Sequence, residues 1–136
     1  GCTGAAVTRG KKGEHIKDIN DTFHWFCENY IKYNVDEDLL PVDQHMLLAL
    51  IAPRPLYVAS SSLDEWADPD SELLSCRLAS EAYELYGLDG VIAPESIEEN
   101  TAYHNGRIAY HRKTGEHSLT KQDWELFLDF SDKHLK

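Results

Sequence analysis

Two short apolar runs predict β-strands in the second half of the chain, and a helical pattern lies between them. Residues 55–60 form a run bounded by turn signals, as in a strand covered on both faces, and residues 106–112 predict a second strand. Between them, apolar side chains recur at spacings of three and four residues. This pattern predicts a helix that ends at Gly87. Its single apolar stripe consists of Leu74, Leu78, Ala82, Leu85 and Tyr86.

Capping residues mark where further helices begin. Asp43 is placed to cap residues 46–51, a nearly all-apolar segment that ends before Pro53 and therefore predicts a buried helix. Asp68 precedes Pro69, and proline is favoured at the first helical position, so this pair predicts the start of the helix that carries the stripe.

The other segments carry weaker signals. Residues 23–33 are dense in aromatic side chains and predict a short helix, whereas residues 88–105 have the composition of a loop. Thr120 and Asp123 resemble a capping box that begins a last helix, whose apolar residues are Trp124, Phe127 and Leu128. The order strand, helix, strand, helix predicts a single α/β domain over residues 1–136, with parallel strands and right-handed crossovers.

The composition narrows the range of partners. Hydrophobic residues make up 42% of the chain, as expected of a folded globular protein. The formal net charge is −11, with 24 Asp and Glu against 13 Lys and Arg, and this charge repels phosphate backbones and anionic lipids. The sequence also lacks an apolar run long enough to span a membrane. We therefore expect neither nucleic acid nor a membrane as a partner.

Three cysteines bear on metals and disulfides. Cys2, Cys27 and Cys76 are too far apart for a Cys-x-x-Cys motif, so a zinc site is disfavoured and no metal or cofactor is expected. A Cys2–Cys27 disulfide would close a loop of about 25 residues and stabilise the fold by ~3 kcal/mol. Buried free thiols are an equally good interpretation.

One candidate catalytic residue follows each predicted strand. Asp64 follows the first strand, and His117 follows the second within the segment Gly115-Glu116-His117. An acid loop and then a histidine loop is the order in which an α/β-hydrolase supplies the last two members of a Ser…Asp/Glu…His triad. Gly115 allows the sharp turn that such a histidine needs. The alternative for His117 is an exposed surface residue without a catalytic role, which is common for a lone histidine in a loop. Glu65, in the same loop as Asp64, is a second candidate for the triad acid.

The nucleophile of such a triad is not found in this sequence. No Gly-x-Ser-x-Gly turn occurs, and residues 60–62 are serines without flanking glycines. A complete hydrolase sheet usually needs roughly 200 to 250 residues, so we interpret the chain as the carboxyl-terminal portion of an α/β-hydrolase with an incomplete sheet. Its exposed strand edge and apolar faces favour self-association or pairing with a missing amino-terminal half. Alone, the chain is expected to be inactive.

Two further residues are candidates for substrate binding. Trp66 is flanked by acids, and its indole would stack on a sugar ring if its loop lines the crevice; otherwise it is a half-buried core residue. Gln44 stands at the start of the predicted buried helix. There it either satisfies backbone groups at the helix start or contacts a substrate hydroxyl.

Several of these segments together resemble the bacterial glucuronoyl esterases. The resemblance rests on residues 41–55, 58–69 and 106–117, and also on residues 1–6 and 24–27, all in the family's order. It implies a serine triad that cleaves the ester between glucuronic acid on xylan and an alcohol of lignin, in a secreted or periplasmic enzyme. It also implies that the family's nucleophile motif lies upstream.

Residue roles follow from the same resemblance. His117 would be the general base, Asp64 the triad acid and Trp66 a wall of the sugar subsite. Some family members place the acid on an earlier loop, which would fall just before Gly1. The alternatives are another carbohydrate esterase, such as an acetyl xylan esterase, and a non-catalytic carbohydrate-binding module.

Overall fold

A small mixed sheet forms the centre of the molecule. The computed structural model describes residues 5–9, 12–22 and 25–135. The strand order is β1-β3-β2, and β1 (Leu56–Ser61) runs parallel to β3 (Ile108–Lys113). The short strand β2 (Ala102–Tyr103) pairs antiparallel with β3 and lies within the segment predicted to be a loop. The two predicted strands and their parallel pairing are confirmed.

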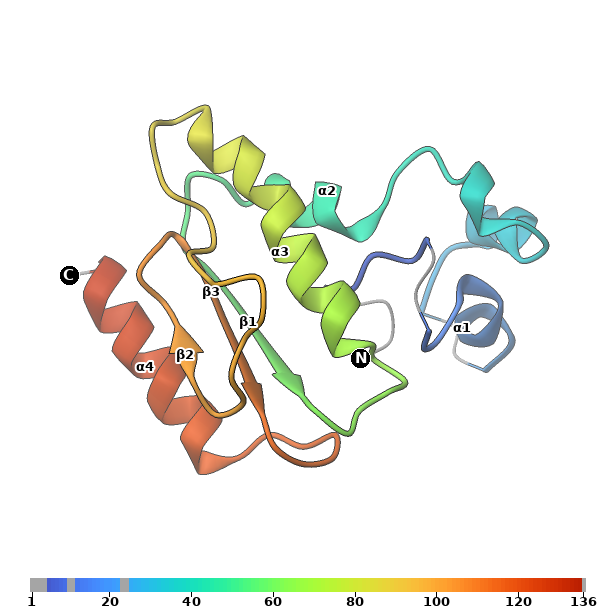
Figure 1. The fold of residues 1–136 in the computed structure, drawn as a ribbon. Helices are drawn as coiled ribbons and strands as arrows, with labels where there is room; N and C mark the ends of the chain where they lie inside the picture. Colours follow the sequence, from blue (N-terminus) through green and yellow to red (C-terminus); the bar gives the residue numbers. More distant parts are fainter. Residues whose placement is uncertain (1–4, 10–11, 23–24, 136) are drawn as a thin grey trace.

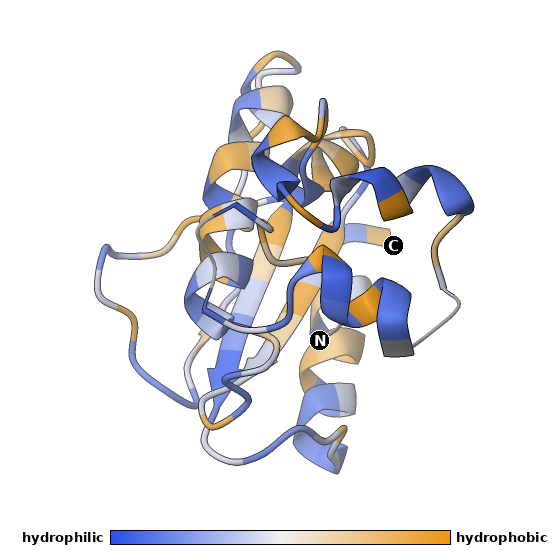
Figure 2. Ribbon diagram, turned by 90° about the vertical axis from the view of Figure 1, so that its right-hand side faces the viewer, coloured by the Kyte–Doolittle hydropathy of each residue, from blue (hydrophilic) through white to orange (hydrophobic). Residues whose placement is uncertain are grey.

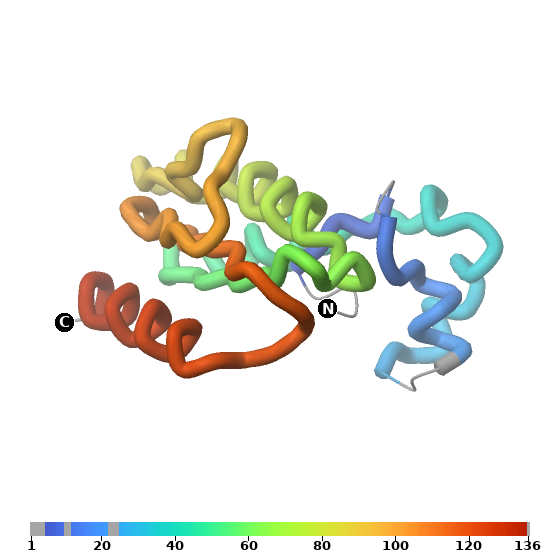
Figure 3. Tube along the Cα trace, turned by 60° about the horizontal axis from the view of Figure 1, so that its bottom comes forward, coloured from blue at the N-terminus to red at the C-terminus, as the bar shows by residue number. Residues whose placement is uncertain are grey.

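Two long helices enclose the sheet. Helix α3 (Pro69–Glu84) covers one face, and α4 (Lys121–Leu135) covers the other (Figures 1 and 3). Side chains alternate along each strand, so successive residues point to opposite faces. Val58 packs in the cluster on the α3 side, and its neighbour Tyr57 contacts the rings of Phe127 and Phe130 on α4. The predicted α/β class is confirmed.

The face of α3 that packs in the core is not the predicted one. In the predicted stripe, Leu74 is 44% exposed and Leu85 is 87% exposed. The buried face of α3 consists instead of Leu73, Cys76, Ala79 and Tyr83. Helical periodicity identifies an apolar stripe but does not determine which side of the helix packs against the sheet. Small residues such as Ala79 allow the helix to approach the strands closely.

The predicted burial of the short helix after Asp43 is also wrong. Helix α2 (Gln44–Ala49) buries Leu48, whereas Leu47 is 55% exposed. Because its six residues make fewer than two turns, α2 presents one side to the core cluster of α3. Its outer side lines an apolar pocket of about 300 Å³ together with Tyr30 and Val42.

The segment before α2 folds into short helices beside the sheet (Figure 1). These are α1 (Ile16–Thr22) and two 3₁₀ turns, η1 (Glu28–Tyr33) and η2 (Glu37–Leu39). The predicted helix over residues 23–33 is thus realised in part, and residues 23–24 lie outside the described residues. Cys2 does too, but Cys27 is a free and exposed thiol, which contradicts the predicted Cys2–Cys27 disulfide and, for this residue, the alternative of buried thiols. Cys76 is free and buried, as that alternative predicts. Within the described ranges, no helix combines the length and apolar character needed to cross a membrane.

The predicted helix caps are confirmed. Asp68 accepts a hydrogen bond from the backbone N–H of Ser71 at the start of α3. Asp43 caps α2 by accepting from the N–H of Gln44 at 2.7 Å, and it also accepts from the N–H groups of Thr8 and Arg9. Burial opposes ionisation of Asp43, but these hydrogen bonds outweigh it and lower the pKa of the carboxyl group. Asp43 therefore ties the amino-terminal segment to α2.

Substituting this cap should destabilise the protein measurably. We expect Asp43→Ala to lower the free energy of unfolding by about 2 kcal/mol, because buried donors lose their acceptor. The folded pKa of Asp43 is below its unfolded value, so the loss is complete above the ordinary carboxylate pKa and shrinks as the pH falls below it. Denaturant unfolding of the intact protein at several pH values measures both effects. The control is Asp36→Ala, which removes an exposed cap and should lower the free energy of unfolding by less than about 0.5 kcal/mol. Equal decreases in the two variants would contradict the role of Asp43 in tying the amino-terminal segment to α2.

Candidate active site

Both predicted catalytic loops leave the same edge of the sheet. Figure 2 shows the two parallel strands changing from hydrophobic at their starts to hydrophilic at their carboxyl ends. The pairing continues past the strand ends, because the N–H of Ser62 donates to the carbonyl of Lys113 at 2.8 Å and that of Leu63 donates to Gly115 at 2.9 Å. The loops that carry Asp64 and His117 are thereby held side by side.

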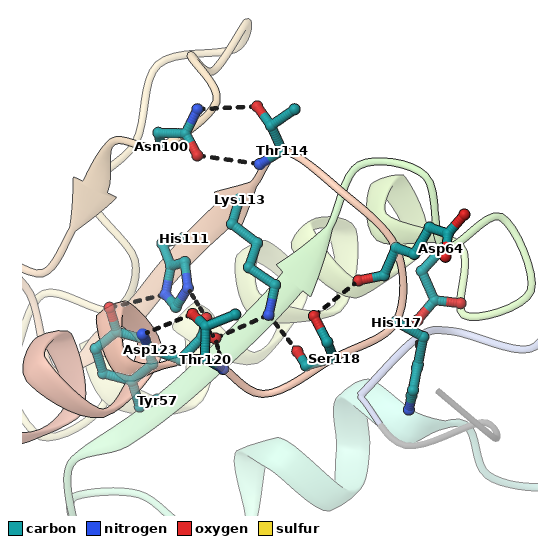
Figure 4. Close-up of polar contacts among 11 residues, drawn as sticks. Tyr57, Asp64, Asn100, His111, Lys113, Thr114, His117, Ser118, Thr120 and Asp123 are labelled. Atoms are coloured by element: carbon teal, nitrogen blue, oxygen red, sulfur yellow. Dashed lines mark hydrogen bonds and ion pairs between the residues drawn. The ribbon is translucent and has the colours of Figure 1, made fainter.

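Asp64 and His117 are in direct contact. The imidazole Nδ1 of His117 lies 2.6 Å from Oδ2 of Asp64, and Figure 4 shows both side chains near the loop that follows β3. The Asp64 side chain is 11% exposed, whereas that of His117 is 74% exposed. An ionised carboxylate only accepts hydrogen bonds, so Nδ1 carries the proton and Nε2 is left as an acceptor. The pair can therefore take up a proton at Nε2.

The turn before His117 requires its glycine. Gly115 has φ = +128°, a conformation that residues with a side chain rarely adopt, and a Cβ at this position would meet no atom within 4 Å. Backbone conformation, and not a lack of space, explains the glycine. The predicted role of Gly115 in the turn is confirmed.

Trp66 lies next to this pair in sequence, and a buried acid fixes one edge of its ring. Trp66 is 54% exposed, and its Nε1–H donates to Oε1 of Glu14 at 2.7 Å. Glu14 is fully buried, and its Oε2 has no hydrogen-bond partner among the described residues. A Cβ on Gly13 would lie 2.1 Å from the Trp66 carbonyl oxygen, so the two segments touch through their backbones. No motif or periodicity marks Glu14, and its role appears only through this long-range contact.

Gln44 lies at the start of α2, as predicted, where its N–H donates to the cap residue Asp43. It lines the apolar pocket described above, whose lining does not include Asp64, Trp66 or His117. Of the four predicted site residues, Asp64, Trp66 and His117 thus lie in the loops at the carboxyl ends of the parallel strands, and Gln44 does not. A substrate contact by Gln44 stays a prediction.

The serines and cysteines near the core are engaged or buried. Ser60 donates to Glu72 at 2.6 Å, and the hydroxyl of Ser62 accepts from the N–H of Gly115. Residues 62–68 separate β1 from α3, so no sharp strand-to-helix nucleophile turn follows β1. Burial raises the pKa of the Cys76 thiol well above its usual range. Within the described residues, no group of three His, Cys, Asp or Glu side chains is arranged to hold a metal ion.

Beneath the His117 loop lies a buried polar cluster that the sequence did not reveal. His111 on β3 is fully buried and contacts Asp123 at 2.7 Å, and Asp123 also accepts from Lys113 at 2.8 Å (Figure 4). Only the capping role of Asp123 was predicted, and that role is confirmed by the hydrogen bond from the Thr120 N–H to its carboxylate.

Comparison with known proteins places these features in context. Residues 2–87 match the family "Glucuronyl esterase, fungi". A carbohydrate esterase from an unknown prokaryotic organism is 43% identical over 136 residues, which cover 99% of this chain and 31% of that protein. A 4-O-methyl-glucuronoyl methylesterase of Podospora anserina is 31% identical over 90 residues, covering 64% of this chain and 19% of that protein.

Solved structures agree with the sequence comparison. A promiscuous esterase of carbohydrate esterase family 15, from a marine bacterial metagenome, superposes with a TM-score of 0.92 at 42% identity, over 98% of this chain and 34% of that one. The glucuronoyl esterase from Solibacter usitatus gives a TM-score of 0.86 at 42% identity, over 95% of this chain and 33% of that one. The chain thus spans about a third of the length of these relatives. With the family match over most of its length and this structural agreement, the chain belongs to the glucuronoyl esterases of carbohydrate esterase family 15, and its sheet is part of their α/β-hydrolase fold.

Proposed function

We propose that this chain supplies the histidine and the acid of a serine-esterase triad within a longer enzyme that cleaves esters of glucuronic acid. The observation that carries the proposal is the contact of 2.6 Å between Nδ1 of His117 and Oδ2 of Asp64, beyond the carboxyl ends of two parallel strands. Open α/β sheets place their ligand crevice at that edge.

The proposed mechanism uses the exposed nitrogen of His117. A serine from outside this chain attacks the ester carbonyl while Nε2 of His117 takes its hydroxyl proton. The imidazolium then donates that proton to the departing alcohol, which leaves a glucuronoyl ester on the serine. Water hydrolyses this ester by the same sequence, with Nε2 again accepting a proton. Asp64 holds the imidazole in the required tautomer and stabilises its charged form.

Asp64 is favoured over an acid located before Gly1. Its carboxylate is mostly buried, accepts a second hydrogen bond from the N–H of Ala67 at 3.3 Å, and already orients the imidazole. A second carboxylate would have to displace this contact in order to reach Nδ1.

The sugar is proposed to contact the exposed face of Trp66. Because Glu14 holds the indole N–H, the plane of the ring is fixed, and a sugar can stack on it without ordering a mobile side chain. A 4-O-methyl-glucuronoyl methylesterase among the relatives supports a glucuronate ester as the substrate. We propose the ester between glucuronic acid on xylan and an alcohol of lignin. Since these polymers are extracellular, the enzyme would be secreted or periplasmic.

The rest of the enzyme is proposed to cover the apolar side chains that this chain exposes. Leu50 on the α2 side is 78% exposed and Leu85 at the end of α3 is 87% exposed. Exposed apolar area of this kind favours association, either with the portion that carries the nucleophile or with a second copy. The chain alone is expected to lack esterase activity, because its proposed nucleophile comes from elsewhere.

The triad assignment predicts the effects of two substitutions in the intact enzyme. His117→Ala should lower kcat/KM on a benzyl glucuronate ester at least about a thousandfold, and Asp64→Asn by about 100-fold or more, because the general base and its orienting acid are lost. The control is His15→Ala, which removes a histidine in a similar contact of 2.6 Å with Glu37 and should leave the rate unchanged.

The outcomes separate the alternatives. Wild-type activity in His117→Ala would exclude the esterase proposal, and sugar binding without hydrolysis in the wild type would indicate a binding module. Wild-type activity in Asp64→Asn alone would move the acid to another loop. A faster rate on acetylated xylan than on glucuronate esters would assign the acyl specificity to acetyl groups.

The glycine before His117 provides a second prediction. Gly115→Ala and Gly87→Ala each place a side chain at positive φ, at +128° and +69°, without a steric clash within 4 Å. Both should lower the free energy of unfolding by about 1–2 kcal/mol. Only Gly115→Ala should also lower kcat, by roughly 10-fold, because it displaces the imidazole. Enzyme kinetics and thermal unfolding of both variants provide the comparison, and equal kcat values would show that this turn does not position His117.

A further inference from the structure

A chain of buried polar groups runs from the α4 face of the sheet to the loop that carries His117. His111, Lys113 and Asp123 have side chains that are 1%, 8% and 1% exposed. Charged groups at this depth are costly unless they are paired and hydrogen-bonded. Apolar residues of similar size would fill the same space, so the cluster calls for an explanation beyond packing.

The proton positions in the cluster follow from its partners. Burial lowers the pKa of His111 despite the hydrogen bond to Asp123, so the imidazole is neutral near pH 7. Its Nε2–H donates to Oδ1 of Asp123 at 2.7 Å, and its Nδ1 accepts from the hydroxyl of Tyr57 at 3.0 Å. Burial opposes ionisation of Asp123, but hydrogen bonds from Lys113 and Thr120 outweigh it and lower the pKa of the carboxyl group. Asp123 therefore stays ionised and paired with the Lys113 ammonium group.

Both charged members of the cluster contact the backbone of the loop. The Nζ of Lys113 donates to the carbonyl oxygen of Ser118, the residue directly after His117 (Figure 4). Oδ2 of Asp123 accepts from the N–H of Thr120 at 2.6 Å and from its hydroxyl at 2.7 Å. The loop is thus held on both sides of Leu119, immediately after the proposed general base.

The first part of the loop has its own anchors. Oδ1 of Asn100 accepts from the N–H of Thr114 at 3.0 Å, and Nδ2 of Asn100 donates to the Thr114 hydroxyl at 2.9 Å. Gly115 is held by the segment that follows β1. His117 itself is 74% exposed and packs little. The direction of its ring is therefore set by Asp64 and by the backbone fixed at Ser118.

We propose that Lys113 and Asp123 are positioning residues, which hold the Ser118 carbonyl and thereby fix the imidazole of His117 for proton transfer. The inference rests on the proposed function of His117 as the general base. Both side chains are buried, so the proposal gives neither of them a contact with the substrate. Displacing a reacting group by about 1 Å can cost a factor of about 100 in rate, so the loss of these anchors should affect kcat more than KM.

The test compares variants of the intact enzyme. Lys113→Met removes the ammonium group while keeping a long side chain, and Lys113→Arg keeps the charge. Lys121→Met is the matched control, because Lys121 lies on α4 beside the same loop and its side chain is 89% exposed, where it pairs with Glu125 at 3.1 Å. Steady-state kinetics on a benzyl glucuronate ester are combined with hydrogen-exchange mass spectrometry of residues 114–120.

We expect Lys113→Met to lower kcat about 10- to 100-fold with KM within about threefold of wild type, and to speed amide exchange in residues 114–120. Lys113→Arg should recover most of the lost kcat, and Lys121→Met should match wild type. If Lys113→Met does not fold, the double variant Lys113→Met/Asp123→Asn removes both charges and leaves no unpaired ion. That variant should show the same fall in kcat at a near-normal unfolding temperature.

A wild-type kcat in Lys113→Met, or in the folded double variant, would overturn the inference. So would a fall in kcat that is matched by Lys121→Met. His117→Ala, assayed in parallel, distinguishes failure of the positioning role of Lys113 from failure of the proposed esterase function. If it is inactive while Lys113→Met is fully active, the positioning role fails and the esterase proposal stands. If His117→Ala is itself active, the proposed function fails.

Discussion

The parallel pairing of β1 with β3 is the constraint on which the rest of the molecule depends. It aligns two strands that are about fifty residues apart in sequence, and it continues into their loops through hydrogen bonds from Ser62 and Leu63 to the carbonyls of Lys113 and Gly115. A slip of one residue in this register would turn successive side chains to the wrong faces of the sheet. Tyr57 and His111 would then point to opposite faces of the sheet, and Asp64 would no longer be aligned with His117.

The strand β3 contributes both to the buried polar cluster and to the exposed loop that carries His117. Its inward-facing residues His111 and Lys113 join the buried cluster with Asp123, and the loop that begins directly after Lys113 carries His117 to the surface. The buried charges thus lie beneath an exposed imidazole that contacts the carboxylate of Asp64 at 2.6 Å. A proposed general base on so exposed a loop needs support from below, and the contact of Lys113 with the Ser118 carbonyl provides a physical means for it.

Features that depend on neighbouring residues were predictable from the sequence, and features that depend on distant packing were not. The caps at Asp43 and Asp68 were identified because a capping side chain acts within three residues. The buried side of α3 was missed, because Cys76 and Ala79 give a weaker apolar signal than the exposed Leu74 and Leu78. Asp64 and His117 were found through chain order. The role of Glu14 was not predicted, because its contact with Trp66 joins segments 52 residues apart.

The central claim is that His117 and Asp64 act on a serine that this chain does not contain. The most direct measurement is a crystal structure of the intact enzyme after covalent reaction with a phosphonate inhibitor of serine esterases. The account predicts an adduct whose serine Oγ lies within about 3 Å of Nε2 of His117, with Asp64 still bound to Nδ1. An adduct whose serine lies against a different histidine, with His117 turned to solvent, would contradict it.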